Sequence, residues 1–111
     1  MTPIDPVIVT IQELKIAKKI LEILEYKREK YGDDYAWIYL NDIIRSLHEI
    51  KSRSIRSFID KLERLGVIEY LPVYREDEEK GYEWSGGLFR FTPNGIEKIN
   101  KELDEILFKN A

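Results

Sequence analysis

The feature that most constrains the fold is an amphipathic helix pattern that stops at a glycine and runs directly into a β-branched segment. In the stretch SRSIRSFIDKLERLGVIEY, residues 52–70, apolar residues recur at spacings of three and four. Gly66 is a natural helix end, because glycine adopts the positive φ that helix C-termini commonly need. Val67 to Tyr74 has the composition of a strand, and Pro72 predicts that this strand is an edge or contains a bulge.

A second short helix precedes this one after a tight turn. Asn41 is a good N-cap for the segment NDIIRSLHEI, whose buried face would be Ile43, Ile44 and Leu47. Lys51 and Ser52 form the turn, and Ser52 is the expected N-cap of the third helix. The inward face of that third helix is predicted to contain Ile55, Phe58 or Ile59, Leu62 and Leu65.

The strand after Gly66 is expected to return as a hairpin. Its tip is the long polar segment REDEEKGYEWSGG, residues 75–87, and the returning strand is Leu88 to Phe91. Thr92 then caps a last helix of about residues 93–108, with Pro93 at its first position, where proline is favoured. One apolar stripe runs along this helix, formed by Ile96, Ile99, Leu103, Ile106 and Leu107.

The N-terminal third contains a long helix with an unusually wide apolar face. Residues 1–10 are expected to form an extended arm, and a helix follows from about residue 11 to residue 30. Two adjacent stripes cover about half of its circumference at ~100° per residue. Either a second copy of the chain or other helices of the same domain would cover them. The first interpretation predicts a dimer interface that contains Ile16, Ile20, Ile23, Leu103, Ile106 and Leu107.

A break and a short strand join this helix to the second one. The segment YGDD, residues 31–34, contains glycine and aspartates that end helices, and residues 36–40, AWIYL, are aromatic and β-branched. The predicted order is therefore helix, short strand, helix, helix, strand, loop, strand, helix. The predicted class is α+β and mostly helical.

Composition narrows the class of protein. A chain of 111 residues that is 43% hydrophobic fits one domain, here residues 11–111 after the arm. It lacks cysteine, and no apolar run reaches the ~18 residues of a membrane span. We therefore expect a cytoplasmic protein without disulfides or membrane contact. A charged fraction of 35%, with many isoleucines, lysines and glutamates, favours a hot-environment source, such as an archaeon.

Positive charge is concentrated on the third helix. The whole chain carries a net charge of −3, whereas residues 45–64 contain six basic and three acidic residues. Arginine forks onto guanine or phosphate, and serine donates at short range to a DNA backbone. The candidate DNA-contacting residues are Lys51, Ser52, Arg53, Ser54, Arg56, Ser57, Lys61 and Arg64. The alternative is a solvated helix face on which Asp60 and Glu63 pair with these cations.

This order of elements resembles the winged helix-turn-helix transcription regulators of the MarR-like and PadR-like groups. The resemblance rests on SIRSFIDKLERLGVIEYL and LFRFTPNGIEKI and covers about residues 11–108. It implies a helix-turn-helix at about residues 41–65, whose second helix (52–65) reads DNA, and a wing at about residues 67–91. The wide apolar face of the first helix separately suggests a homodimer, in which the first and last helices would form the interface.

The predicted wing departs from the family pattern. Residues 75–83, REDEEKGYE, contain two basic and five acidic residues, and carboxylates there would be repelled by phosphate. Arg75 and Lys80 are candidate wing contacts, and Arg90 on the returning strand is a third. The acidic tip would otherwise limit nonspecific binding or contact a basic protein partner.

Other chemistry has little support in the sequence. His48 is the only histidine, and without cysteine a zinc site would rest on carboxylates alone. No glycine-rich phosphate loop or catalytic constellation is present, so we expect no cofactor, no metal and no enzymatic activity. Strand aromatics such as Trp37 and Phe89 would pack in the core or at an interface, or else stack on bases.

Two functions remain open. The first is a sequence-specific double-stranded DNA-binding protein, a small homodimeric transcription regulator. The second is a winged-helix adaptor that binds proteins and does not contact DNA, which the net negative charge and the acidic tip favour.

Overall fold

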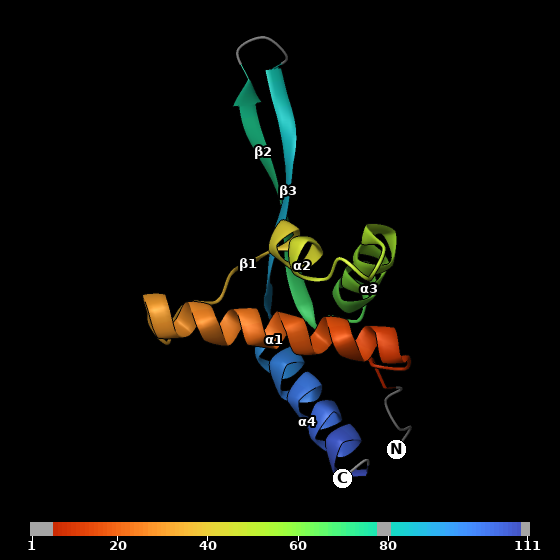
Figure 1. The fold of residues 1–111 in the computed structure, drawn as a ribbon. Coiled ribbons are helices and arrows are strands. Elements are labelled where there is room, and N and C mark those ends of the chain that lie inside the picture. Colours follow the sequence, from red (N-terminus) through yellow and green to blue (C-terminus); the bar gives the residue numbers. More distant parts are fainter. Residues whose placement is uncertain (1–5, 78–80, 110–111) are drawn as a thin grey trace.

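A computed structural model describes residues 6–77 and 81–109. The predicted order of elements is confirmed, with two strands that are longer than expected (Figure 1). The elements are α1 (Ile11–Tyr31), β1 (Ile38–Tyr39), α2 (Leu40–Ser46), α3 (Ser52–Arg64), β2 (Ile68–Asp77), β3 (Gly81–Phe91) and α4 (Pro93–Lys109).

The three strands form one antiparallel sheet in the order β1-β3-β2. Pro72 lies on the edge strand β2, and the register shifts between Pro72 and Tyr74, as the sequence predicted. The prediction that 75–87 forms a loop was wrong, because β2 continues to Asp77 and β3 already begins at Gly81. Aromatic residues in the pairs Tyr74–Trp84 and Glu76–Tyr82 favour strand, which explains the continued pairing.

One hydrophobic core joins the helices to the base of the sheet. Phe89 from β3 is fully buried, together with Ile20 of α1, Ile43 of α2 and Ile55 of α3. The hairpin of β2 and β3 extends away from this core, and α2 and α3 lie on the same side of α1 as the hairpin (Figure 1). Helix α4 extends on the opposite side of α1.

Part of the N-terminal segment, residues 6–10, packs into the core. Val7 and Ile8 are 0% and 7% exposed and belong to the core. At the start of α1, the Thr10 hydroxyl accepts a hydrogen bond from Glu13 N at 3.0 Å, and the Glu13 carboxylate accepts one from Thr10 N. This capping box fixes the direction in which the segment enters the helix.

Two predicted helix starts are late, by two residues for α2 and by one residue for α3. Helix α2 begins at Leu40 rather than after Asn41, because Leu40 is itself buried in the core. Helix α3 begins at Ser52, so that Lys51 and not Ser52 is the N-cap, and no side chain caps it. Leu65 was also expected to point inward, but it lies just past the last turn of α3 and is 53% exposed.

A hydrogen-bonded corner joins two glycine-containing motifs that lie far apart in the sequence. Gly66 has a φ of 75° and ends α3, and Val67 N donates to Leu62 O at 2.9 Å. Thr92 N donates to Val67 O at 3.0 Å, and the Thr92 hydroxyl donates to Gly66 O at 2.8 Å. The same hydroxyl accepts from Gly95 N, so Thr92 caps α4 as predicted.

Gly95 leaves no room for a side chain at this corner, because a Cβ atom there would collide with the Val67 carbonyl. Gly95→Ala is expected to lower the free energy of unfolding by about 1–3 kcal/mol, as overpacking does. Urea denaturation measures this change. Asn94→Ala, at the exposed neighbouring position, is the control and should shift stability by less than about 0.5 kcal/mol. Equal stability of the two variants would contradict the close approach.

Candidate nucleic-acid interface

Helix α3 divides cleanly into a buried and an exposed face. The buried side chains are Ile55, Phe58, Ile59 and Leu62, at the spacing that the sequence predicted. The residues of the helix that lie open to solvent are Ser52, Arg53, Arg56, Ser57, Asp60, Glu63 and Arg64. The packing of α3 against α2 and β2 therefore leaves its polar face uncovered.

The N-terminal half of this polar face is hollowed. An open depression of about 430 Å³, which we call the α3 hollow, is lined only by Ser52, Arg53, Arg56, Ser57 and Asp60. Four of these five residues are candidate DNA contacts, and the structure brings them together. The fifth, Asp60, adds an acceptor to a surface that otherwise presents hydrogen-bond donors.

The remaining α3 candidates lie outside the hollow. Lys51 is exposed and immediately precedes the helix, and Arg64 is exposed at its last residue. Ser54 is half-buried and is therefore a poorer contact than its neighbours. The helix is 13 residues long and lacks a side-chain cap, so its first turn presents backbone N–H groups near the two arginines.

Lys61 was predicted to face DNA, but the structure gives it a partner within the protein. Its Nζ lies 2.9 Å from Oε2 of Glu13, at the start of α1, and its side chain is only 25% exposed. Lys61 therefore links α3 to α1 and does not extend the exposed basic surface. The alternative pairing that the sequence suggested, with Asp60 or Glu63, is not the one that Lys61 makes.

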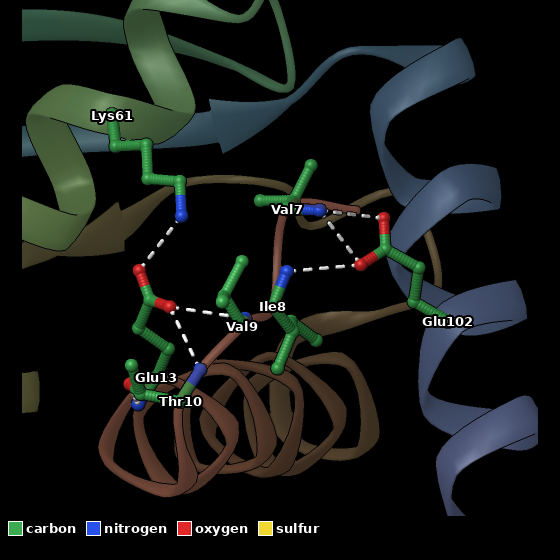
Figure 2. Close-up of polar contacts among 7 residues, drawn as sticks. All are labelled: Val7, Ile8, Val9, Thr10, Glu13, Lys61 and Glu102. Atoms are coloured by element: carbon green, nitrogen blue, oxygen red, sulfur yellow. Dashed lines mark hydrogen bonds and ion pairs between the residues drawn. The ribbon is translucent and has the colours of Figure 1, made fainter. Parts of the chain in front are cut away.

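Glu13 holds several groups at once (Figure 2). Its Oε1 accepts hydrogen bonds from Val9 N and Thr10 N, each at 3.0 Å, and its Oε2 accepts from Lys61. Burial of this carboxylate raises its pKa, but the hydrogen bonds from Lys61 and the two backbone amides outweigh burial. The net effect holds the pKa of Glu13 below its usual value.

Of the three wing candidates, Arg90 has partners within the protein. Arg90 Nε lies 2.7 Å from Oε2 of Glu69 on the adjacent strand, and its guanidinium lies over the Trp37 ring at 4.8 Å. Arg75 lies in β2 with its backbone opposite Glu83, and Lys80 lies outside the described residues. The side chain of Arg90 thus stabilises the base of the hairpin.

A second cluster of cations and aromatic rings lies at the far end of α1. Lys27 forms an ion pair with Asp42 at 3.1 Å and lies 5.0 Å from the centre of the Tyr39 ring. Burial lowers the pKa of Lys27, but the Asp42 contact dominates, so the net pKa is raised. The ion pair between Lys27 and Asp42 joins α1 to α2, and the contact with Tyr39 joins the end of α1 to β1.

The residues proposed from the sequence for a dimer interface fall into two groups. Ile16, Ile20 and Leu103 are buried in the core of the single chain, and Ile23 and Ile106 pack against that core. The chain's own elements therefore cover both stripes of α1. The apolar residues that remain exposed near the chain ends are Val9 and Ile11 before and in α1, and Leu107 and Phe108 in α4.

Other classes of site find no support in the part of the chain that is described. Among the side chains that the structure describes, no three from histidine, aspartate or glutamate gather as they would around a metal ion. His48 is exposed. Within residues 6–77 and 81–109, no helix has both the length and the apolar character required to cross a membrane.

Comparison with solved structures identifies the fold. A cysteine-to-serine mutant of MarR from E. coli, solved in complex with operator DNA, aligns with a TM-score of 0.52 and 18% identity. The chain has a MarR-like winged helix-turn-helix fold. The alignment covers 93% of this chain but only 64% of the MarR chain. A possible transcriptional regulator from Methanosarcina mazei Go1 aligns with a TM-score of 0.51, 15% identity and coverage of 94% and 74%.

The winged-helix likeness is structural only. No family model matches the sequence, and no curated protein matches it either. At 15–18% identity, the shared property is the arrangement of the elements. In this winged helix, α2 and α3 form the helix-turn-helix, and β2 and β3 form the wing.

Sequence reasoning missed the two carboxylates that organise the N-terminal segment. The spacing of Thr10 and Glu13 is a capping-box signature, so half of the role of Glu13 was visible in the sequence. Its contact with Lys61, 48 residues away, carried no local signal. Glu102 is 9% exposed and accepts hydrogen bonds from Val7 N and Ile8 N, a role that nothing in its helical pattern indicated.

The lowered pKa of Glu13 predicts a pH dependence of stability. Because the folded pKa is depressed, the stabilisation from this carboxylate is fully present above the usual value near 4.5 and is lost as the pH falls through the folded value. Glu13→Gln should cost about 1 kcal/mol of unfolding free energy at pH 7 and much less near pH 3.

Urea unfolding of the wild type and the variant at both pH values measures this difference. Glu22→Gln is the matched control, because Glu22 pairs with Lys19 on the same helix and is 70% exposed. A difference between wild type and Glu13→Gln that stays constant from pH 7 to pH 3 would contradict the role of the ionised carboxylate.

Proposed function

We propose that the protein is a DNA-binding transcription regulator that acts as a homodimer and reads the major groove of double-stranded DNA with α3. The observation that carries this proposal is the α3 hollow, in which two arginines and two serines share the uncovered face of a helix. Helix α3 itself lies on the same side of α1 as the hairpin (Figure 1).

The chemistry of the hollow suits a nucleic acid. Arg53 and Arg56 each present a planar fork of donors, which matches the O6 and N7 acceptors of guanine or two oxygens of a phosphate. Ser52 and Ser57 are short donors that permit close approach to the backbone. Residues in the first turns of a docked recognition helix are the ones that reach base edges.

The fold supports the same function. MarR, one of the structural neighbours, was solved with operator DNA. The net charge of −3 does not oppose this proposal, because the positive charge gathers on one helix face. Each phosphate contact adds affinity that does not depend on the base sequence. A local patch contacts few phosphates, so the sequence-dependent contacts supply a larger share of the affinity.

The dimer part of the proposal rests on exposed apolar residues near the end of α4. Leu107 and Phe108 are 52% and 83% exposed, and α4 extends on the side of α1 opposite the hairpin. A second copy that covers these side chains would leave both α3 hollows open. Two such helices would then read half-sites about one helical turn apart, ~34–36 Å.

Removal of the two arginines tests the DNA-reading role of α3. Arg53→Ala with Arg56→Ala should weaken binding to a duplex from upstream of the protein's own gene by at least about tenfold, because each forked contact contributes about 1–3 kcal/mol. Fluorescence anisotropy at two salt concentrations measures the affinity and its salt slope. The unfolding midpoint should stay close to that of the wild type, because both side chains are exposed.

Lys15→Ala with Lys18→Ala is the matched control, since it removes two exposed positive charges from α1 and leaves α3 intact. Unchanged affinity of the Arg53→Ala, Arg56→Ala variant would contradict the proposed role of α3. If the wild type binds no duplex even at low salt, the adaptor function, with a basic protein partner for the acidic tip, becomes the better account.

The dimer is tested by sedimentation velocity. The wild type is expected to sediment as a dimer, with twice the 13.2 kDa mass of the chain. Leu107→Ser with Phe108→Ser should shift it to monomer, because the interface loses its apolar side chains. Lys101→Ser, an exposed position on the same helix, should leave the dimer intact. A monomeric wild type at concentrations that saturate DNA would contradict the homodimer.

A further inference from the structure

We propose that Glu13 is a positioning residue for DNA reading, because it holds α3 through Lys61 and joins that helix to the N-terminal segment. This inference rests on the proposed function for its effect on DNA, but its effect on α3 itself is independent of DNA. Glu13 is not one of the proposed DNA-contacting residues, because it lies on α1 and lines no part of the α3 hollow.

The first step is the contact between the two helices. Oε2 of Glu13 and Nζ of Lys61 lie 2.9 Å apart, and their side chains are only 16% and 25% exposed. A pair that is largely shielded from water keeps more of its attraction than an exposed one. Elsewhere α3 packs on the core through Ile55, Phe58, Ile59 and Leu62, and the corner at Gly66 holds its C-terminal end. The ion pair with Glu13 is a directional polar contact between α3 and α1.

The second step is the position of Lys61 on α3. Lys61 directly follows Asp60, the last residue that lines the hollow, and lies one turn after Ser57. A displacement of this turn changes where Arg53 and Arg56 point. Base reading tolerates little displacement, because forked hydrogen bonds need both distance and direction.

The third step is what holds Glu13 in place. Its other oxygen accepts from the backbone of Val9 and Thr10, so the carboxylate cannot swing away without loss of two further hydrogen bonds. The preceding residues are held in turn by Glu102 of α4, whose Oε1 accepts from Val7 N at 2.8 Å and from Ile8 N at 2.9 Å. Figure 2 shows this run of contacts from α4 to α3.

Two carboxylates on either side of the N-terminal segment thus connect α4 with α3. Lys98 lies 3.3 Å from Oε2 of Glu102 and supports its charge from the same helix. The segment between the carboxylates has two buried side chains, Val7 and Ile8, which fix its depth in the core.

Hydrogen exchange of the DNA-free protein tests the positioning of α3. Glu13→Gln is expected to raise amide exchange in residues 59–64 about threefold or more, and Lys61→Met should do the same. The double variant should exchange no faster than either single variant, because contacting partners are not additive. Glu22→Gln, on the same helix but paired with Lys19, should leave α3 unchanged.

DNA binding then separates positioning from direct contact. If Glu13 positions α3, Glu13→Gln should reduce the preference for the upstream duplex over random DNA by about threefold to tenfold, with little change in the salt slope. If Lys61 instead reaches for a phosphate when DNA is present, Glu13→Gln would release it and strengthen binding to both duplexes. Lys61→Met would then lower the salt slope by about one.

Each outcome has one meaning. Faster exchange in α3 together with a reduced preference supports the proposal, and stronger binding by Glu13→Gln overturns it. Unchanged α3 exchange in Glu13→Gln and Lys61→Met also overturns it, whatever the DNA result. Faster exchange in a protein whose wild type binds no duplex leaves Glu13 as the residue that positions α3 and shows that the proposed function has failed.

Discussion

The carbonyl group of Val67 lies at the corner on which the rest of the fold depends. It accepts a hydrogen bond from Thr92 N, and Thr92 also donates to Gly66 O and caps α4. The end of α3, the base of the wing and the start of α4 are therefore joined within a few residues. Glycine at position 95 is what allows α4 to approach this closely.

This corner and the N-terminal carboxylates hold α3 from two directions. The corner fixes the C-terminal end of the helix, and Glu13 fixes the turn that contains Lys61. Neither contact covers the hollow near the N-terminal end of α3. The result is a helix that is held at two places while its arginines and serines lie on the exposed face, as the proposed base reading requires.

The sequence predicted those helix ends and strand features that residues close to them in the chain determine. Gly66 marked the end of α3, Thr92 and Pro93 marked the start of α4, and Pro72 marked the irregular edge strand. The amphipathic spacing of α3 placed Arg53 and Arg56 on the open face. These features depend on the backbone preferences and the apolar periodicity of one segment, so the sequence of that segment is enough to predict them.

Contacts between distant segments were not predictable in the same way. Lys61 and Arg90 looked like free cations, yet they pair with Glu13 and Glu69, and the geometry of each pair depends on the folded arrangement. The two prolines suggested an extended arm but gave no sign that Glu102 accepts hydrogen bonds from the amides of Val7 and Ile8, which permits their burial. Burial of a charged carboxylate is uncommon and follows from its partners, which helical periodicity does not reveal.

The most direct test of the central claim is an NMR titration of the ¹⁵N-labelled protein with a duplex from upstream of its own gene. The account predicts that the largest amide shift changes lie in residues 51–60, around the α3 hollow, with smaller changes along the hairpin. Saturable binding whose shift changes lie elsewhere, with residues 51–60 unaffected, would contradict the account.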